Sequence, residues 1–526
     1  MRIAVRSATA ALAVAVSLVW PAGAAALNDL VIIVGCASGE SIGRALSRPT
    51  VVDRRMVVVV SGTCTENVVI ERDEVTLQGE PGAGVVAADP ALPTISLLGA
   101  RRIVITSLAV SGGSDGISAN RGSGLDVSAC TLQGNSRFGL VVSYNGTATL
   151  DNCTIQNNGN HGAVAANGAQ LVVTNSTVQN NAGNGLVGTR NSHLRVGQDA
   201  NGGSTPGPVT IRSNGQNGVG ITDSAAAIVI GGVIENNAGN GVAVGGSSSA
   251  MIGIGSFNVT APVTIRGNNS NGVNIDQGSR GLVQDCSVEN NGRTGVRIHG
   301  AAGTVIGSHI HGNGQYGVAS LNGSSALIGL ADNNTPSGNL IENNFLEGVH
   351  VVGASSAWMF GNTIQGNSLT NGRYGVLAVE NSALRFIGLN TIQNNGSIVG
   401  GVIGGGIFLR ASGLFMQKGD FNVTPNTNSV QNNTGDGIQA VENSTIDLRD
   451  GVLVNGNTAD GIRLIHGVRL RAQATTISGN TTAGIRLQLG STARFGPAPN
   501  TLVDAIVCTD IESSVSGALA PGCTGF

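Results

Sequence analysis

The amino-acid sequence predicts an all-β solenoid in which each coil consists of three short parallel strands. Three observations support this fold class: a glycine that recurs at intervals close to 23 residues, three short alternating apolar runs in each copy, and 81 glycines with only 3% aromatic residues in 526. A chain of this length would ordinarily divide into several domains, but a solenoid grows in one direction. We therefore expect one elongated domain.

The repeat begins at the glycine that opens each segment of the type Gly-Val-x-Ile. The copies start at Gly116, Gly139, Gly162, Gly185, Gly218, Gly241, Gly272, Gly295, Gly317, Gly348, Gly375, Gly406, Gly437, Gly461 and Gly484. In "GAVAANGAQLVVTNSTVQNNAGN", three runs alternate with period two and are too short and too β-branched for helices. Because each run recurs at the same phase, the runs should stack about 4.8 Å apart over a rod of roughly 80 Å.

Both ends of the chain differ from the repeats. Residues 1–26 are predicted as a signal peptide, because Arg2 and Arg6 precede the apolar run "ATAALAVAVSLVW" and the small-residue stretch "PAGAAA". We assign residues 27–66 to an N-terminal cap, 67–500 to the coils and 501–526 to a C-terminal cap. The protein should be secreted or periplasmic, without a membrane span, because no later stretch offers the roughly 18 uninterrupted apolar residues that a spanning helix needs.

Charge and cysteine usage limit the partners and the chemistry. The formal net charge is −3 and charged residues make up 11% of the chain, so neither nucleic acid nor an anionic membrane is favoured as a partner, and we expect a monomer. Exported cysteines invite pairing, and Cys36 with Cys64 and Cys508 with Cys523 can each join one end of the rod. Three other cysteines share one repeat phase and should be buried as small hydrophobes; they are Cys130, Cys153 and Cys286.

Asparagine pairs precede many of the repeat glycines, as in "QNNG" and "ENNAG". They predict a ladder in which side-chain amides stack at a tight turn, and we assign them no chemistry. Together with the repeats, these features resemble the right-handed parallel β-helix of the pectate lyase-like superfamily. "SIGRAL" resembles the amphipathic helix that closes the N-terminal end, and "MVVVVSGTCTENVVIERDEVTLQGEPGAGVV" resembles the opening coils, with Cys64 where tyrosine is usual. The resemblance covers roughly residues 40 to 500 and implies a single-stranded right-handed β-helix with an N-terminal capping helix; it says less about activity.

The candidate site comes from the outward rows of the coils. Residues one and three after each repeat glycine are apolar almost throughout, so residues two and four should face outward. Consecutive coils then place Asn274 beside Arg297 and Asp276 beside His299, about 5 Å apart at their Cβ atoms. The superfamily includes β-elimination and C5-epimerisation of uronates. For that chemistry Arg297 and Asn274 would neutralise a carboxylate, His299 would act as base with Asp276 orienting it, and Tyr316 would protonate the leaving oxygen. The alternative is an ordinary polar surface in which these contacts are structural.

Other polar residues are weaker candidates. His350 and Trp358 are predicted to contact a substrate, and His309 with His311 forms either a pair of metal ligands without a third partner or a solvated strand. We predict no metal or cofactor, although calcium at the loop carboxylates is an open alternative; these are Asp199, Asp332 and Asp420.

Four long insertions fall between the second and third strands of their coils. They contain "GQDANGGSTPGP", "GIGSFNVTAP", "GLADNNTPSGN" and "MQKGDFNVTPNTNS". Such a row of loops is typical of a binding edge, and drift at a permissive turn would produce it equally well.

Catalytic signatures of the superfamily do not recur here. Asp115 in "GSDG" and His161 in "GNHG" lack the paired aspartates and the R-x-K of polygalacturonases, and D-P-H-D of alginate epimerases is missing from the sequence. Two hypotheses remain: a protein that binds an extracellular polysaccharide or a cell-surface component, and a lyase or C5-epimerase acting on uronate-containing glycans. The scarcity of aromatic side chains weakens both interpretations as a sugar-binding protein. The weakly polar surface favours the first.

Overall fold

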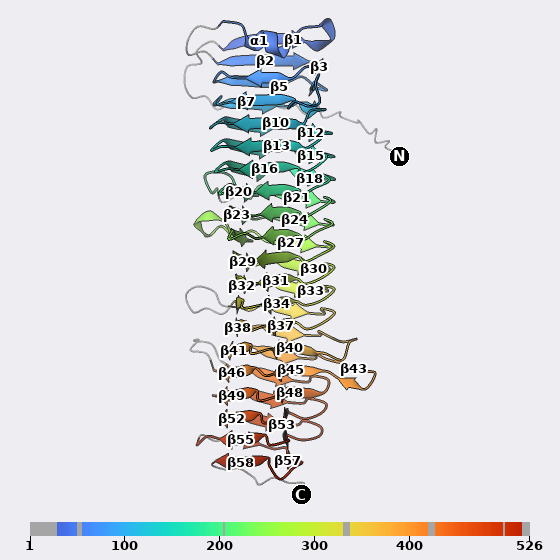
Figure 1. The fold of residues 1–526 in the computed structure, drawn as a ribbon, viewed down its shortest axis with the longest axis vertical. Helices are drawn as coiled ribbons and strands as arrows, with labels where there is room; N and C mark the ends of the chain where they lie inside the picture. Colours follow the sequence, from blue (N-terminus) through green and yellow to red (C-terminus); the bar gives the residue numbers. More distant parts are fainter. Residues whose placement is uncertain are drawn as a thin grey trace, which may run out of the picture.

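The protein forms a single β-solenoid, as the computed structural model shows for residues 29–49, 55–203, 206–329, 337–418, 427–497 and 500–517 (Figure 1). Each coil contributes one strand to each of three parallel sheets, for example β16 (Ala163–Ala166), β17 (Gln170–Thr174) and β18 (Thr177–Gln179). In the described part of the chain, the first sheet has 18 strands from β4 (Val68–Ile70) to β57 (Ile506–Cys508), the second 20 from β1 (Leu30–Gly35) to β58 (Ser514–Gly517), and the third 18 from β3 (Thr63–Thr65) to β56 (Thr501–Leu502). The predicted fold class is confirmed.

The core is a column of aliphatic side chains that runs the length of the rod. In β31 (Val296–His299), Val296 and Ile298 are fully buried while the two polar residues between and after them are partly exposed. Strict alternation sends every second side chain inward, and each buried Val or Ile contributes about 1.5–3 kcal/mol of transfer free energy. The coils are therefore stabilised by contacts with their immediate neighbours.

The asparagine ladder is confirmed at the turn between the third and first sheets. Its members are Asn135, Asn158, Asn181, Asn214, Asn237, Asn268, Asn291, Asn313, Asn344, Asn367, Asn395, Asn433, Asn457 and Asn480. Asn181 shows the pattern, because its Nδ2 donates to Oδ1 of Asn214 at 3.0 Å and to the carbonyl of Ile155 at 3.2 Å. The preceding Asn180 has a φ of 55°, a left-handed conformation that asparagine tolerates.

The N-terminal end is closed by the short helix α1 (Ile42–Leu46), as predicted. The Glu66 carboxylate accepts hydrogen bonds from the backbone N–H groups of Ile42 and Gly43 at 2.7 and 3.1 Å, which ties the helix to the first coils. The predicted Cys36–Cys64 disulfide is present. None of the described helices is long and apolar enough to cross a membrane.

Of the other predictions on the termini and the cysteines, some concern residues that the structure describes and some do not. Cys130, Cys153 and Cys286 are buried free thiols, as expected, and burial raises the pKa of the Cys286 thiol to about 12. The predicted signal peptide, residues 1–26, lies outside the described residues, as does Cys523, the expected partner of Cys508.

Each of the four insertions follows a strand of the second sheet and precedes a strand of the third sheet, as predicted. The first described pair connects β20 (His193–Val196) to β21 (Val209–Arg212) and β26 (Ser249–Ile252) to β27 (Val263–Arg266), and both loops project from the same edge of the rod (Figure 1). A further projection was not predicted: β43 (Ile398–Val399) and β44 (Val402–Ile403) form an antiparallel hairpin between a third-sheet strand and a first-sheet strand.

Candidate functional site

The predicted polar cluster lies on the first sheet. Strand β28 (Val273–Asp276) pairs in parallel with β31, with Asn274 opposite Arg297 and Asp276 opposite His299. The register therefore places these four side chains as neighbours, as the repeat spacing predicted. What each side chain contacts differs in part from the expectation.

Hydrogen bonds join Arg297, Asn274 and Asp276 into a chain. Nη1 of Arg297 donates to Oδ1 of Asn274 at 2.9 Å, and Nδ2 of Asn274 donates to Oδ2 of Asp276 at 2.8 Å. Partial burial lowers the pKa of Arg297, with Asp276 opposing this shift and Arg293 adding to it. Asn274 thus fixes the guanidinium while Asp276 holds the amide in place.

The expected contact in which Asp276 orients His299 does not occur among the hydrogen bonds and ion pairs of the described residues. Asp276 accepts from Asn274 on its own strand, and His299 turns toward the next coil, where its Nε2 lies 2.7 Å from Nδ2 of Asn322. An amide nitrogen can only donate, so Nε2 of His299 is the acceptor in this contact. The lone pair that a general base would use is therefore occupied.

A pocket of about 340 Å³ opens beside Arg297. It is lined by Asn240, Ser270, Asn271, Asn274, Arg293, Thr294, Arg297, Gln315, Tyr316 and Leu321. Two of these ten described residues are arginines and none is a carboxylate, so the pocket is electropositive and suited to an anion. His299 is not among the lining residues. Arg293 was missed from the sequence because it lies in the turn before the repeat glycine, outside the outward rows.

The end of a second asparagine ladder lines one side of this pocket, through Asn240 and Asn271. This ladder occupies the position directly before the repeat glycine and contains Asn184, Asn217, Asn240 and Asn271. The Oδ1 of Asn271 accepts the backbone N–H of Thr294 at 3.2 Å. Thr294 and, one coil later, Tyr316 occupy the position before the repeat glycine in place of asparagine. The pocket therefore opens where the ladder of amides ends and larger polar side chains begin.

His161 starts the second ladder and provides a testable pH dependence. Its Nδ1 accepts the backbone N–H of Asn184 at 2.9 Å, and burial lowers its pKa below the ordinary 6.5. The unfolded chain then binds more protons than the folded chain just below that value, so stability should fall as pH drops through and below about 6.5. We expect His161→Asn, which supplies a ladder amide, to show a smaller loss of thermal unfolding midpoint between pH 7.5 and pH 5 than the parent, as measured by circular dichroism. Equal losses in both proteins would contradict this account.

Tyr316 connects the pocket to a buried ionic group behind it. Its ring stacks on His350 of β37 (Val349–Val352) with centroids 4.0 Å apart. Nδ1 of His350 lies 3.4 Å from the carboxylate of Glu347, whose side chain is fully buried, and Nη1 of Arg373 lies 3.2 Å from the other oxygen of that carboxylate. Burial, and secondarily Glu347, raises the pKa of Tyr316, with Arg373 opposing. Tyr316 is therefore a neutral hydrogen-bond donor at the edge of the pocket.

Trp358 is not brought together with the other predicted residues. It lies on β38 (Ser356–Met359) of the second sheet, where the guanidinium of Arg385 stacks 4.5 Å from its ring. The repeat pattern predicts the place of Trp358 within its coil, but it does not predict that Trp358 contacts the pocket.

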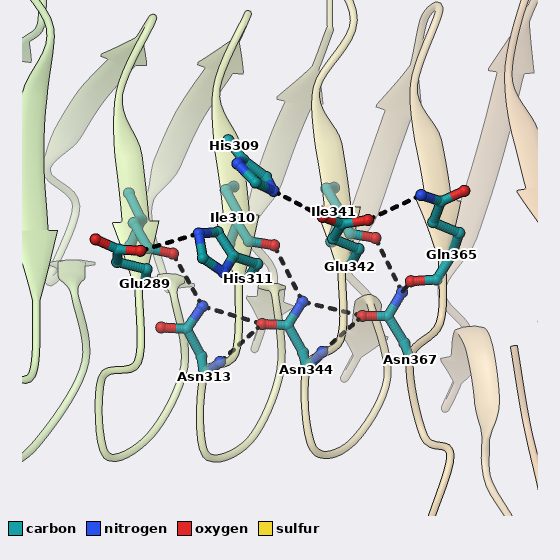
Figure 2. Close-up of polar contacts among 11 residues, drawn as sticks. Glu289, His309, Ile310, His311, Asn313, Ile341, Glu342, Asn344, Gln365 and Asn367 are labelled. Carbon is teal, nitrogen blue, oxygen red and sulfur yellow. Dashed lines mark hydrogen bonds and ion pairs between the residues drawn. The ribbon is translucent and has the colours of Figure 1, made fainter.

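The two histidines considered either as metal ligands or as a solvated strand each contact a carboxylate of a neighbouring coil (Figure 2). In β33 (His309–His311), Nε2 of His309 lies 2.9 Å from Glu342 and Nε2 of His311 lies 3.0 Å from Glu289, while the two rings stack with centroids 4.1 Å apart. The Nε2 atoms point to opposite neighbours, and the described residues contain no group of three or more potential ligands arranged for a metal ion. The solvated-strand interpretation fits this geometry.

The loop carboxylates proposed as calcium ligands are only partly described. Oδ1 of Asp199 accepts the backbone N–H groups of Asn201 and Gly203 at 2.8 and 2.9 Å, so it caps its own loop. Asp332 and Asp420 lie outside the described residues.

Comparison with known proteins gives a family match. The family model described as "Right handed beta helix region" matches residues 60–201 and 255–388. A search of the curated proteins found no match.

Several solved structures are similar at low identity. A periplasmic alginate epimerase, AlgG, has a TM-score of 0.37 at 11% identity, covering 73% of this chain and 84% of that one. The A-module of the Azotobacter vinelandii mannuronan C-5 epimerase AlgE6 has 0.29 at 15%, covering 89% and 92%, and the PL6 family alginate lyase AlyGC has 0.31 at 11%, covering 95% and 87%. Similarity at this level identifies neither a substrate nor a reaction.

Proposed function

The chain belongs to the family of right-handed β-helix proteins, and from this premise we propose that it is an exported protein that binds a uronate-containing polysaccharide. The observation that carries the proposal is the pocket on the first sheet, where Arg293 and Arg297 converge with amides and Tyr316 and no described lining residue is acidic. A guanidinium recognises a carboxylate through two parallel hydrogen bonds, which gives both charge and geometric selectivity.

The rest of the pocket complements a sugar ring. The amides of Asn240, Asn271 and Gln315 offer donors and acceptors for hydroxyl groups, and the ring of Tyr316 offers an apolar face. A neutral polysaccharide would offer no carboxylate of its own to the two guanidinium groups, although Asp276 already supplies Arg297 with a nearby counter-charge. We therefore expect acidic polymers to be preferred over neutral ones.

The proposal is tested by calorimetric titration of the mature protein with a panel of polyuronates and neutral polysaccharides. Saturable binding of at least one polyuronate, weakened by added salt, supports it, because the contacts are between charged groups near the surface. Equal affinity for neutral polymers, or binding to none of the acidic ones, contradicts it.

A second candidate function is chemistry at C5 of the uronate, favoured by the position of Tyr316. In β-elimination a base removes the C5 proton, the electron pair forms the C4–C5 double bond, and the leaving O4 takes a proton from Tyr316 as the glycosidic bond breaks. Epimerisation instead returns a proton to C5 from the opposite face. His299, the predicted base, can act only after its Nε2 is released from Asn322.

Substitution of Tyr316 by phenylalanine separates binding from chemistry. The ring remains stacked on His350 while the proton donor is lost, so we expect polyuronate affinity within about twofold of the parent. Any elimination, followed through the ultraviolet absorbance of the new conjugated double bond, should fall by roughly 100-fold or more.

Tyr144→Phe is the matched control, because Tyr144 is an exposed tyrosine in an N-terminal coil. If the parent shows no elimination on any polyuronate and no exchange of the C5 proton with solvent by NMR, the catalytic candidate fails while the binding proposal stands. If elimination occurs and Tyr316→Phe retains its full rate, the assigned proton donor is wrong.

A further inference from the structure

A long groove lies on the outer face of the second sheet, away from the electropositive pocket. Its volume is about 540 Å³, within the range of small-molecule sites. It crosses six consecutive coils, through β20, β23 (Ala226–Val229), β26, β29 (Arg280–Gln284), β32 (Ala302–Ile306) and β35 (Ser325–Ile328). With strands about 4.8 Å apart, the lining extends over roughly 24 Å.

The groove is apolar along most of its length because two outward rows differ in size. One row presents large aliphatic side chains that are only partly covered: Ile228, Met251, Leu282 and Leu327. The parallel row presents four small side chains, Ala226, Ser249, Ala302 and Ser325, with Arg280 between Ser249 and Ala302. Thr304 stands between Leu282 and Leu327, so this aliphatic ridge has one polar interruption. A trough bounded mainly by aliphatic side chains is unusual on a soluble surface and indicates a ligand or partner.

The charges around the groove all have one sign. Arg195 stands at its β20 end beside the imidazole of His193, Arg280 stands in the row of small side chains between Ser249 and Ala302, and none of the described lining residues is acidic. Nη1 of Arg195 donates to the backbone carbonyl of Asp199 at 3.2 Å, which holds its guanidinium at this end. The groove therefore combines an aliphatic trough with one guanidinium at its β20 end and a second midway along it.

Two insertions stand beside the aliphatic ridge. They begin immediately after Val196 and Ile252, where β20 and β26 end. Hydrogen bonds join the two loops, because Nε2 of Gln198 donates to the carbonyl of Ser256 at 3.2 Å and Oε1 of Gln198 accepts its N–H at 3.0 Å. The described wall is thus tied together rather than formed by independent loops.

We propose that this groove binds the acyl chain of an anionic amphiphile, with the anionic head group at His193 and Arg195 and the chain along the aliphatic ridge. A volume of 540 Å³ spread over about 24 Å leaves a mean cross-section of about 22 Å², which admits a single file of methylene groups. Each methylene removed from water contributes about 0.8 kcal/mol. A polysaccharide fits this groove less well, since none of the described lining residues is a Trp, Tyr or Phe on which a sugar could stack.

The test is calorimetric titration of the full chain with hexadecanoate, with hexadecanol as the uncharged probe. We expect saturable binding of hexadecanoate, roughly tenfold weaker binding of hexadecanol, and roughly tenfold weaker hexadecanoate binding in Arg195→Glu. Leu282→Gln, on the aliphatic ridge, should weaken both probes. Arg471→Glu is the matched control, because Arg471 occupies the same phase of the second sheet far from the groove.

Other outcomes overturn the proposal. If hexadecanoate does not saturate, or if Leu282→Gln and Arg195→Glu bind it like the parent, the groove is not an acyl site. If sedimentation shows self-association that Leu282→Gln abolishes, and no acyl binding is seen, a second copy of the chain is the occupant instead. Arg297→Ala should leave hexadecanoate binding unchanged, so this result is independent of the polyuronate proposal.

Discussion

Replacing Arg297 with alanine should weaken polyuronate binding by roughly 10- to 100-fold. The guanidinium is held by a 2.9 Å hydrogen bond to Asn274 and lines the pocket together with Arg293, so it meets a carboxylate without first being ordered. A charge-assisted hydrogen bond in a partly buried pocket contributes about 1.5–3 kcal/mol, which sets the expected loss. Calorimetric titration against a polyuronate measures it directly.

The matched control is Arg212→Ala. Arg212 lies on the outer face of the third sheet and donates through Nε to the amide oxygen of Gln179 in the preceding coil at 2.9 Å, so it reproduces the arginine–amide contact away from the pocket. Its removal should leave polyuronate affinity unchanged. If both variants lose affinity equally, binding depends on overall charge and not on the pocket.

Breaking the main asparagine ladder should destabilise the fold strongly. In Asn181→Leu, the Nδ2 and the backbone N–H of Asn158 both lose their acceptor, the Oδ1 of residue 181. The carbonyl of Ile155 loses the donor Nδ2 of the same side chain, and all three groups lie in a buried turn. Each buried polar group left unpaired costs about 1–3 kcal/mol, so we expect a loss of about 3–4 kcal/mol in the free energy of unfolding. Denaturant titration followed by circular dichroism provides the measurement.

Gln179→Ala tests whether burial is the cause. Gln179 belongs to an amide row on the same coil, donating to Gln156 at 2.8 Å, but on the partly exposed face of the third sheet. Water can replace its contacts, so its loss should cost about 0.5 kcal/mol or less. If both substitutions lowered the free energy of unfolding by a similar amount, burial would not be the reason that the ladder amides stabilise the fold.

The fold was predictable because its determinants are local and repeated. The glycine spacing and the alternation around residues such as Val296 and Ile298 set the strands, and stacking at the same phase sets the register that places Asn274 beside Arg297. The ladder and the Cys36–Cys64 pair followed from the same periodicity and from the end of the rod on which the cysteines fall.

The contacts within the site were less predictable, because register places Cβ atoms but not the ends of side chains. Asp276 bonds to Asn274 on its own strand instead of orienting His299. Glu347 is fully buried although a carboxylate before a repeat glycine looks like any polar turn residue. Glu347 and Tyr316 both directly precede a repeat glycine, and this shared position is the one sequence signal that could have identified Glu347 as part of the site.

The most direct test of the proposed function compares a uronate oligosaccharide with the same oligosaccharide after its carboxyl groups have been reduced to alcohols. Titrated into the parent protein, the acidic form should bind roughly tenfold or more tightly than the reduced form, and Arg297→Ala should remove most of that difference. Equal affinities of the parent for the two forms, or a preference that survives in Arg297→Ala, would contradict carboxylate recognition by this pocket.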